Sequence, residues 1–123
     1  MKEYKRPKTI FCDIDGTLTV HPQWGQPGSK NLEQQLTVLP GVVEKLWQWD
    51  RLGYNIILTT GRKEGLREIT IEQLKKANII YDQLIMGLGG GERVLINDKK
   101  PDGRETALAI NLQRDVGIEN VEL

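Results

Sequence analysis

Residues 9–17 read Thr-Ile-Phe-Cys-Asp-Ile-Asp-Gly-Thr, and this stretch decides the fold prediction. Its first half is a short apolar run without polar alternation, which is typical of a central parallel strand covered on both faces. Two carboxylates, Asp13 and Asp15, then leave the strand at its carboxyl end. Gly16 permits the tight turn that such an exit requires. Because ligands bind beyond the carboxyl ends of strands in open α/β sheets, the acidic pair lies where a binding site is expected.

The rest of the chain alternates short apolar runs with stretches of helical spacing, which predicts an α/β fold. We expect further strands at 54–60, 93–97 and 108–112, and helices at 40–52 and 66–78. The expected architecture is a three-layer, Rossmann-like parallel sheet with helices on both faces.

Two local features complicate this pattern. Only residues 88–92 separate the apolar run 84–86 from the run 93–97, whereas a parallel crossover to an adjacent strand needs about a dozen residues. The segment 83–87 is therefore expected to be at most a vestigial edge strand. In the second helix Thr70 has capping-box spacing to the glutamine three residues later, so we expect the helix to restart or kink there.

Composition excludes several classes of protein. The 123 residues suit a single domain covering 1–123, and Lys+Arg and Asp+Glu are both 17. This balance argues against a polybasic nucleic-acid binder. No apolar run approaches the ~20 residues of a membrane span, and no signal peptide is visible. The single cysteine, Cys12, excludes an internal disulfide and is expected to be a buried small residue. We therefore expect a cytoplasmic domain without a membrane partner.

The polar, turn-rich stretch 18–38 is too long and too irregular to be simple filler, and we expect a flap near the site. In the following helix Trp47 and Trp49 are two residues apart and therefore point to nearly opposite faces. One of them is expected in the core and the other at the surface, where it would suit a homo-oligomer.

Two other expected strands end in matching chemistry. Thr60, Gly61 and Arg62 place a hydroxyl, a backbone amide and a guanidinium at one strand exit. Asp98 follows another run, and Asp102 comes four residues later. Carboxylates gathered from two strand ends form a hard oxygen site suited to Mg²⁺. Hydroxyl and amide donors beside such a metal are what a phosphoryl group requires.

These motifs, in this order, resemble those of the haloacid dehalogenase-like superfamily of phosphohydrolases, over about residues 8–112. Its first motif is Asp-x-Asp-Gly-Thr, which begins here at Asp13. Its second motif is an apolar strand ending in Thr or Ser, which matches Thr60. Its fourth is an apolar strand ending in acidic residues, which matches Asp98, with Asp102 as a further acidic candidate.

The resemblance implies a Mg²⁺-dependent phosphomonoester hydrolase that works through an aspartyl-phosphate. Asp13 would be the nucleophile and Asp15 the acid and base. Mg²⁺ would be held by Asp13, the main-chain carbonyl of Asp15, and Asp98. Thr60 and the Gly61 amide would bind phosphate oxygens.

The chain departs from the family pattern in two ways. The family expects a Lys or Arg shortly before the fourth strand, but residues 88–92 contain none. Arg93 and Lys99 are the nearest candidates to bind phosphate, and Lys75 and Lys76 are further alternatives. The spacing between motifs also leaves no room for a large cap domain. An open site of this kind would admit large substrates or be closed by a neighbouring subunit.

Other functions remain open at this level. A receiver-type phospho-acceptor module has similar size and residues, but its acceptor Asp ends a middle strand rather than the first. A non-catalytic phosphate-binding protein on the same fold is a second alternative. The substrate would be a small phosphorylated molecule such as a sugar phosphate or nucleotide, or a phosphorylated polymer end. Nucleic acid is not otherwise indicated.

Overall fold

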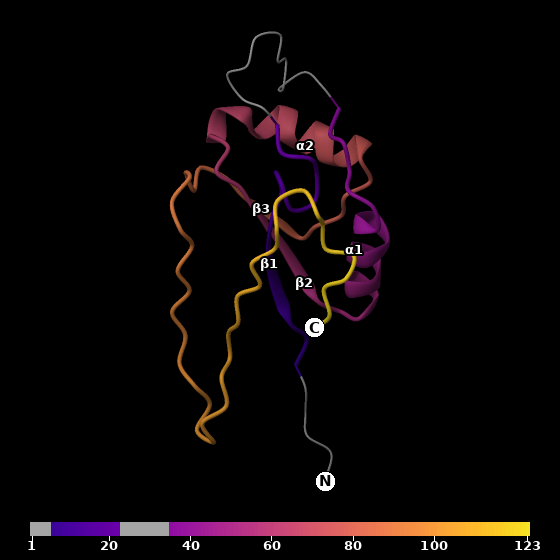
Figure 1. Ribbon diagram of the computed structural model, residues 1–123. Coiled ribbons are helices and arrows are strands. Elements are labelled where there is room, and N and C mark those ends of the chain that lie inside the picture. The colour runs from indigo at the N-terminus through magenta and orange to yellow at the C-terminus, as the bar shows by residue number, and fades with distance from the viewer. Residues whose placement is uncertain (1–5, 23–34) are drawn as a thin grey trace.

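A parallel three-stranded sheet organises the computed structural model, which describes residues 6–22 and 35–123 (Figure 1). The strands are β1 (Thr9–Asp13), β2 (Asn55–Thr59) and β3 (Gln83–Ile85), hydrogen-bonded in the order β1-β2-β3. The predicted α/β class with a parallel sheet is confirmed, and the described residues contain no cap domain.

The helices are α1 (Val42–Arg51) and α2 (Arg67–Lys76), and a short 3₁₀ turn, η1 (Glu64–Leu66), leads into α2. Figure 1 shows α1 beside the sheet and α2 across the carboxyl ends of the strands. Both expected helices are confirmed. The restart expected at Thr70 is wrong, because α2 continues through this residue and its hydroxyl accepts a hydrogen bond from Arg62.

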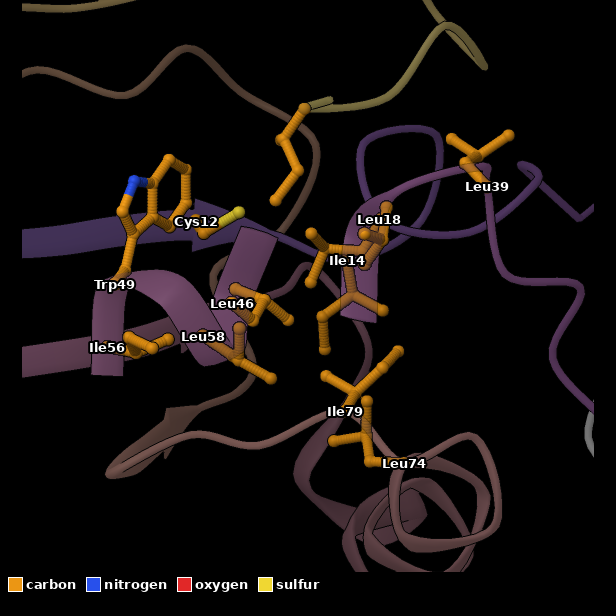
Figure 2. Packing of buried hydrophobic residues seen from close by; sticks show 12 residues of the cluster. Cys12, Ile14, Leu18, Leu39, Leu46, Trp49, Ile56, Leu58, Leu74 and Ile79 are labelled. Atoms are coloured by element: carbon orange, nitrogen blue, oxygen red, sulfur yellow. The ribbon is translucent and has the colours of Figure 1, made fainter. Parts of the chain in front are cut away.

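The core lies on the sheet face that bears Cys12 and Leu58, which are register partners in β1 and β2. Figure 2 shows side chains from β1, α1, β2 and α2 converging on this face. Leu46 is fully buried and Trp49 is 5% exposed; burying a side chain of this size stabilises the fold by about 1.5–3 kcal/mol. Trp47 is 44% exposed, so the expected division between the two tryptophans is confirmed.

The β3 strand is a true member of the sheet. It pairs in parallel with β2, with Leu58 opposite Leu84. The chain between β2 and β3 contains η1 and α2, which supply the dozen residues that a parallel crossover needs. The edge strand expected within 83–87 is therefore confirmed, as a strand of three residues.

Residues 93–112, which we call the arm, form a long excursion away from the sheet (Figure 1). No strand is assigned within it, so the strands expected at 93–97 and 108–112 are wrong. The physical reason is the short connection 88–92, which cannot carry the chain back to the amino ends of the strands. At the tip, the Lys100 amide donates to the Arg104 carbonyl over 2.9 Å.

Both ends of the arm are fixed near the carboxyl edge of the sheet. Before the arm, the Leu88 amide donates to the Thr60 carbonyl over 3.2 Å. After the arm, the Asp115 amide donates to the Gly16 carbonyl over 2.8 Å, and the Asp115 carboxylate accepts from the His21 amide over 2.7 Å. The arm is therefore a loop with two anchored ends.

The expected flap, 18–38, begins and ends in a small bridge. Thr19 and Val38 form an antiparallel bridge, and the Val20 amide donates to the Thr37 carbonyl over 2.8 Å. The central part of the flap, 23–34, lies outside the described residues. Within the described ranges no helix is both long enough and apolar enough to cross a membrane.

Candidate active site

Asp13 is the last residue of β1 and remains open to solvent. Partial desolvation by the surrounding protein raises the pKa of its carboxyl above the ordinary value, and the charge of Asp15 acts in the same direction. Hydrogen bonds from the Ile14 backbone and the Thr17 hydroxyl oppose this rise, the latter at 3.3 Å. Asp13 is thus an accessible carboxylate beside a second negative charge, which favours binding of a cation.

Asp15 is held by Arg62 in a bidentate pair. Arg62 Nε donates to Asp15 Oδ2 over 2.9 Å, and Nη2 donates to Oδ1 over 2.8 Å. The side chain of Arg62 is only 4% exposed, and that of Asp15 is 12% exposed. The third guanidinium nitrogen, Nη1, donates to Thr70 Oγ1 over 3.1 Å and to Gln73 Oε1 over 2.8 Å. Helix α2 therefore fixes the orientation of Arg62, and Arg62 fixes that of Asp15.

This function of Arg62 is missing from the sequence-based set of site residues. The sequence shows that Arg62 follows Thr60 and Gly61, but it does not show that Arg62 pairs with Asp15. A usable signal was the pair Thr70 and Gln73 on the buried side of α2, because buried polar side chains need a hydrogen-bond partner.

Thr60 and Gly61 lie at the same sheet edge as Asp13, since Thr59 is the register partner of Asp13. Thr60 is 1% exposed, and its hydroxyl oxygen accepts from the Arg62 amide over 3.1 Å. A Cβ atom on Gly61 would lie 2.6 Å from the Gly89 carbonyl oxygen. A side chain at Gly61 would therefore separate this turn from the loop that leads into the arm.

Among the candidate cations, Arg93 is the one whose charge acts on the expected nucleophile, Asp13. Its positive charge lowers the pKa of Asp13. Its guanidinium donates to the Gly89 carbonyl over 3.0 Å and to the Gly91 carbonyl over 2.5 Å. Arg93 thus lies on the loop that packs against Gly61. The other candidates lie elsewhere: Lys75 and Lys76 are in the last turn of α2, and Lys99 directly precedes the Lys100–Arg104 turn of the arm.

The expected third metal ligand is not brought to the site by its own chain. Asp98 lies in the arm, because the strand that would have carried it to the sheet is not formed. In the ranges 6–22 and 35–123 no group of three Asp, Glu, His or Cys side chains could hold a metal. Asp102 accepts a hydrogen bond from the Arg104 amide over 2.9 Å, and so has the local bonding of a turn residue.

The donor set of one chain suits Mg²⁺ in part. Mg²⁺ prefers oxygen ligands and usually takes one or two protein carboxylates, with water or phosphate oxygens completing its shell. Asp13 offers such a carboxylate, whereas the Asp15 carboxylate is engaged by Arg62. Cys12 is excluded as a ligand or nucleophile: it is 6% exposed, and burial raises the pKa of its thiol to about 12.

No protein-family model matches the sequence, and no curated protein matches it. Two structures of the Pnkp1/Rnl/Hen1 complex, one described as an RNA repair complex, contain a chain similar to this one. Their sequence identities are 35% and 32%, over 65% and 75% of this chain, with TM-scores of 0.53 and 0.56. A crystal structure from Vibrio cholerae matches at 24% identity over 73% of this chain and 79% of its own, with a TM-score of 0.50.

The acidic turn after β1, together with the similarity to the two chains at 35% and 32% identity, decides the family. The chain belongs to the haloacid dehalogenase-like superfamily. The haloacid dehalogenase-like fold places Asp13 at the end of the first strand, which separates it from a receiver-type module. The chain spans about a quarter to a third of the two Pnkp1/Rnl/Hen1 chains, at 25% and 32% of their length.

Proposed function

We propose that the chain is a Mg²⁺-dependent phosphomonoester hydrolase in which Asp13 is the nucleophile. The observation that carries this proposal is the arrangement at the carboxyl edge of the sheet. An open carboxylate, Asp13, lies beside Asp15, whose orientation is fixed by a buried guanidinium. Thr60 and Gly61 leave the adjacent strand at the same edge.

The residues support a balanced two-step reaction. An Asp13 oxygen attacks phosphorus, the ester oxygen leaves, and Asp15 donates the proton that this oxygen requires. A water molecule then attacks the phosphoryl group, Asp15 takes its proton, and phosphate and free Asp13 are released. A carboxylate has about four acceptor positions, and Arg62 uses two at Asp15, so two remain for other partners.

The other groups bind and orient the phosphate. The Thr60 hydroxyl and the Gly61 amide would donate to its oxygens, and Arg93 would supply positive charge from the loop beside Gly61. When bound by Asp13 and the Asp15 main-chain carbonyl, Mg²⁺ would neutralise the charge between carboxylate and phosphate.

Within this function we propose phosphorylated ends of RNA as the first substrate class to test. The described residues contain no cap domain over the site, so a polymer end is not excluded by size. Two similar structures come from a complex described as an RNA repair complex in one of them.

The test is phosphate release with Mg²⁺ or EDTA. The substrates are p-nitrophenyl phosphate, a sugar phosphate, a mononucleotide, and RNA oligonucleotides phosphorylated at either end. We expect release that EDTA abolishes and that Asp13→Asn abolishes, with the thermal midpoint of this variant nearly unchanged. Unchanged rates in Asp13→Asn together with insensitivity to EDTA would contradict the proposal. Tight phosphate binding without turnover of any substrate would favour the non-catalytic alternative.

A further inference from the structure

The arm exposes apolar side chains that a chain normally covers. Val94 is 80% exposed and Ile96 is 88% exposed on its outward half, and Leu108 is 70% exposed on its return half. Both halves also have the apolar pattern of a strand. Several strongly exposed apolar side chains on one segment are a feature of interaction sites in soluble proteins.

The same chain leaves a strand edge open. β1 is an outer strand of the sheet, and in the described part of the chain no strand pairs with its free side. Phe11, in the middle of β1, is 54% exposed. A five-residue edge with free backbone groups and an exposed aromatic side chain is a template for a further strand.

The outward half of the arm, which includes residues 94–98, cannot fill this edge in parallel within its own chain. It leaves the carboxyl edge of the sheet and runs toward the amino end of β1, so residues 94–98 run against β1 (Figure 1). A parallel strand would first need the chain to return to the amino end, which takes about a dozen residues. Only residues 88–92 precede it.

A second copy of the chain removes this conflict. In a pair related by a two-fold axis perpendicular to the strands, β1 of the partner runs in the opposite direction. Residues 94–98 of the first copy then run parallel to it. Asp98 ends this run, so it comes to the carboxyl end of the partner's β1, where Asp13 of the partner subunit lies.

We propose that two copies of the chain exchange arms. Residues 94–97 of each copy form a strand beside β1 of the other, and Asp98 joins Asp13 and Asp15 of the partner subunit. Each active site is then built from two chains, and the acidic group that the described residues of one copy do not form is completed. The contribution of Asp98 to catalysis rests on the proposed function, whereas the exchange of arms does not.

Association is tested first, by sedimentation equilibrium. The wild-type chain of 14.0 kDa is expected to form a dimer. Ile96→Asp should give monomers that keep the helical far-ultraviolet signal, because this side chain is 88% exposed within one copy. Ile110→Asp, on the return half, is the second variant. Leu52→Asp is the matched control, since Leu52 is 56% exposed but lies outside the arm, and it should remain dimeric.

Shared sites are tested by mixing two inactive variants, Asp13→Asn and Asp98→Asn, and refolding them together. A mixed pair has one site with both carboxylates and one site with neither. With random pairing of two equivalent subunits, about a quarter of wild-type activity should return. A mixture no more active than its parents would overturn the shared site.

The two experiments separate the proposals. A monomeric wild type, or an Ile96→Asp variant as dimeric as the Leu52→Asp control, overturns the arm exchange whatever the activity. A dimeric wild type that Ile96→Asp dissociates, but that hydrolyses no phosphomonoester, supports the exchange and overturns the proposed function alone.

Discussion

Arg62 and Asp15, 47 residues apart in the sequence, form a buried bidentate pair with donor–acceptor distances of 2.9 and 2.8 Å. The pair links β2 and α2 to the acidic turn after β1. It fixes one of the two carboxylates of the site, while Asp13, two residues earlier, stays open to solvent. Two chemically identical groups thereby acquire different environments, as separate nucleophile and acid–base functions require.

Arg62→Ala should destabilise the fold strongly. Removing one partner of a buried ion pair typically costs about 3–5 kcal/mol, and Thr70 and Gln73 lose a donor as well. Urea unfolding measures the free-energy change. Lys76→Ala is the control, because the Lys76–Glu72 pair is 59% exposed on both sides and 3.9 Å long, and such pairs are worth about 0–1 kcal/mol. Equal losses in both variants would contradict the structural importance of the Arg62 pair.

Asp15→Asn should slow hydrolysis in a way that depends on the leaving group. An alkoxide needs a proton when it leaves, whereas an activated aryl oxide does not. The loss in kcat/KM should therefore be larger for an alkyl phosphate than for p-nitrophenyl phosphate. Steady-state kinetics on both substrates measure the difference. Equal losses would assign Asp15 to structure or metal binding rather than proton transfer.

Arg93→Ala should weaken phosphate binding. The guanidinium lies on the loop against Gly61, and its charge acts on Asp13. Charge-assisted hydrogen bonds to a phosphate contribute about 1.5–3 kcal/mol, so kcat/KM should fall by about tenfold or more. Lys75→Ala, which removes an exposed cation from the end of α2, should have little effect. A larger loss of kcat/KM in Lys75→Ala than in Arg93→Ala would indicate that the phosphate counter-charge lies on α2.

Gly61→Ala should disturb the site, because its Cβ would lie 2.6 Å from the Gly89 carbonyl oxygen. Overpacking of this kind costs about 1–3 kcal/mol, and relief of the clash would move the loop that bears Arg93. Gly65→Ala is the control, since no atom lies within 4 Å of its added Cβ. The thermal midpoint and kcat/KM should both fall in Gly61→Ala and stay unchanged in Gly65→Ala. A fully active and stable Gly61→Ala would mean that the loop is not held in place by this contact.

Cys12 should be inert in the folded protein. The thiol is 6% exposed, and burial, with a smaller contribution from the charge of Asp13, raises its pKa to about 12. Iodoacetamide at pH 8 should label it only after unfolding in urea, as mass spectrometry can measure. Stoichiometric labelling of the native chain would show that β1 opens readily.

The amino-acid sequence by itself determined the elements whose signals are local. The apolar run before Asp13 predicted a strand, and helical spacing after Gly41 predicted a helix; both elements were confirmed as β1 and α1. The acidic pair was placed at a strand end for the same reason, because a strand and its exit are encoded by consecutive residues. Burial of Cys12, and of one of the two tryptophans, was expected and is confirmed; the structure shows that the buried tryptophan is Trp49. The expected central position of β1 was wrong, because β1 is an outer strand and Phe11 is 54% exposed.

The tertiary structure alone decided which distant groups meet. The contact between Asp15 and Arg62, and the approach of Gly89 to Gly61, depend on how separate elements pack. The arm shows the limit most clearly, since residues 93–97 have the composition of a strand but form none in a single copy. A strand forms only where its backbone groups can pair with those of a neighbouring strand. The composition of residues 93–97 does not determine whether the connection before them is long enough to reach such a neighbour.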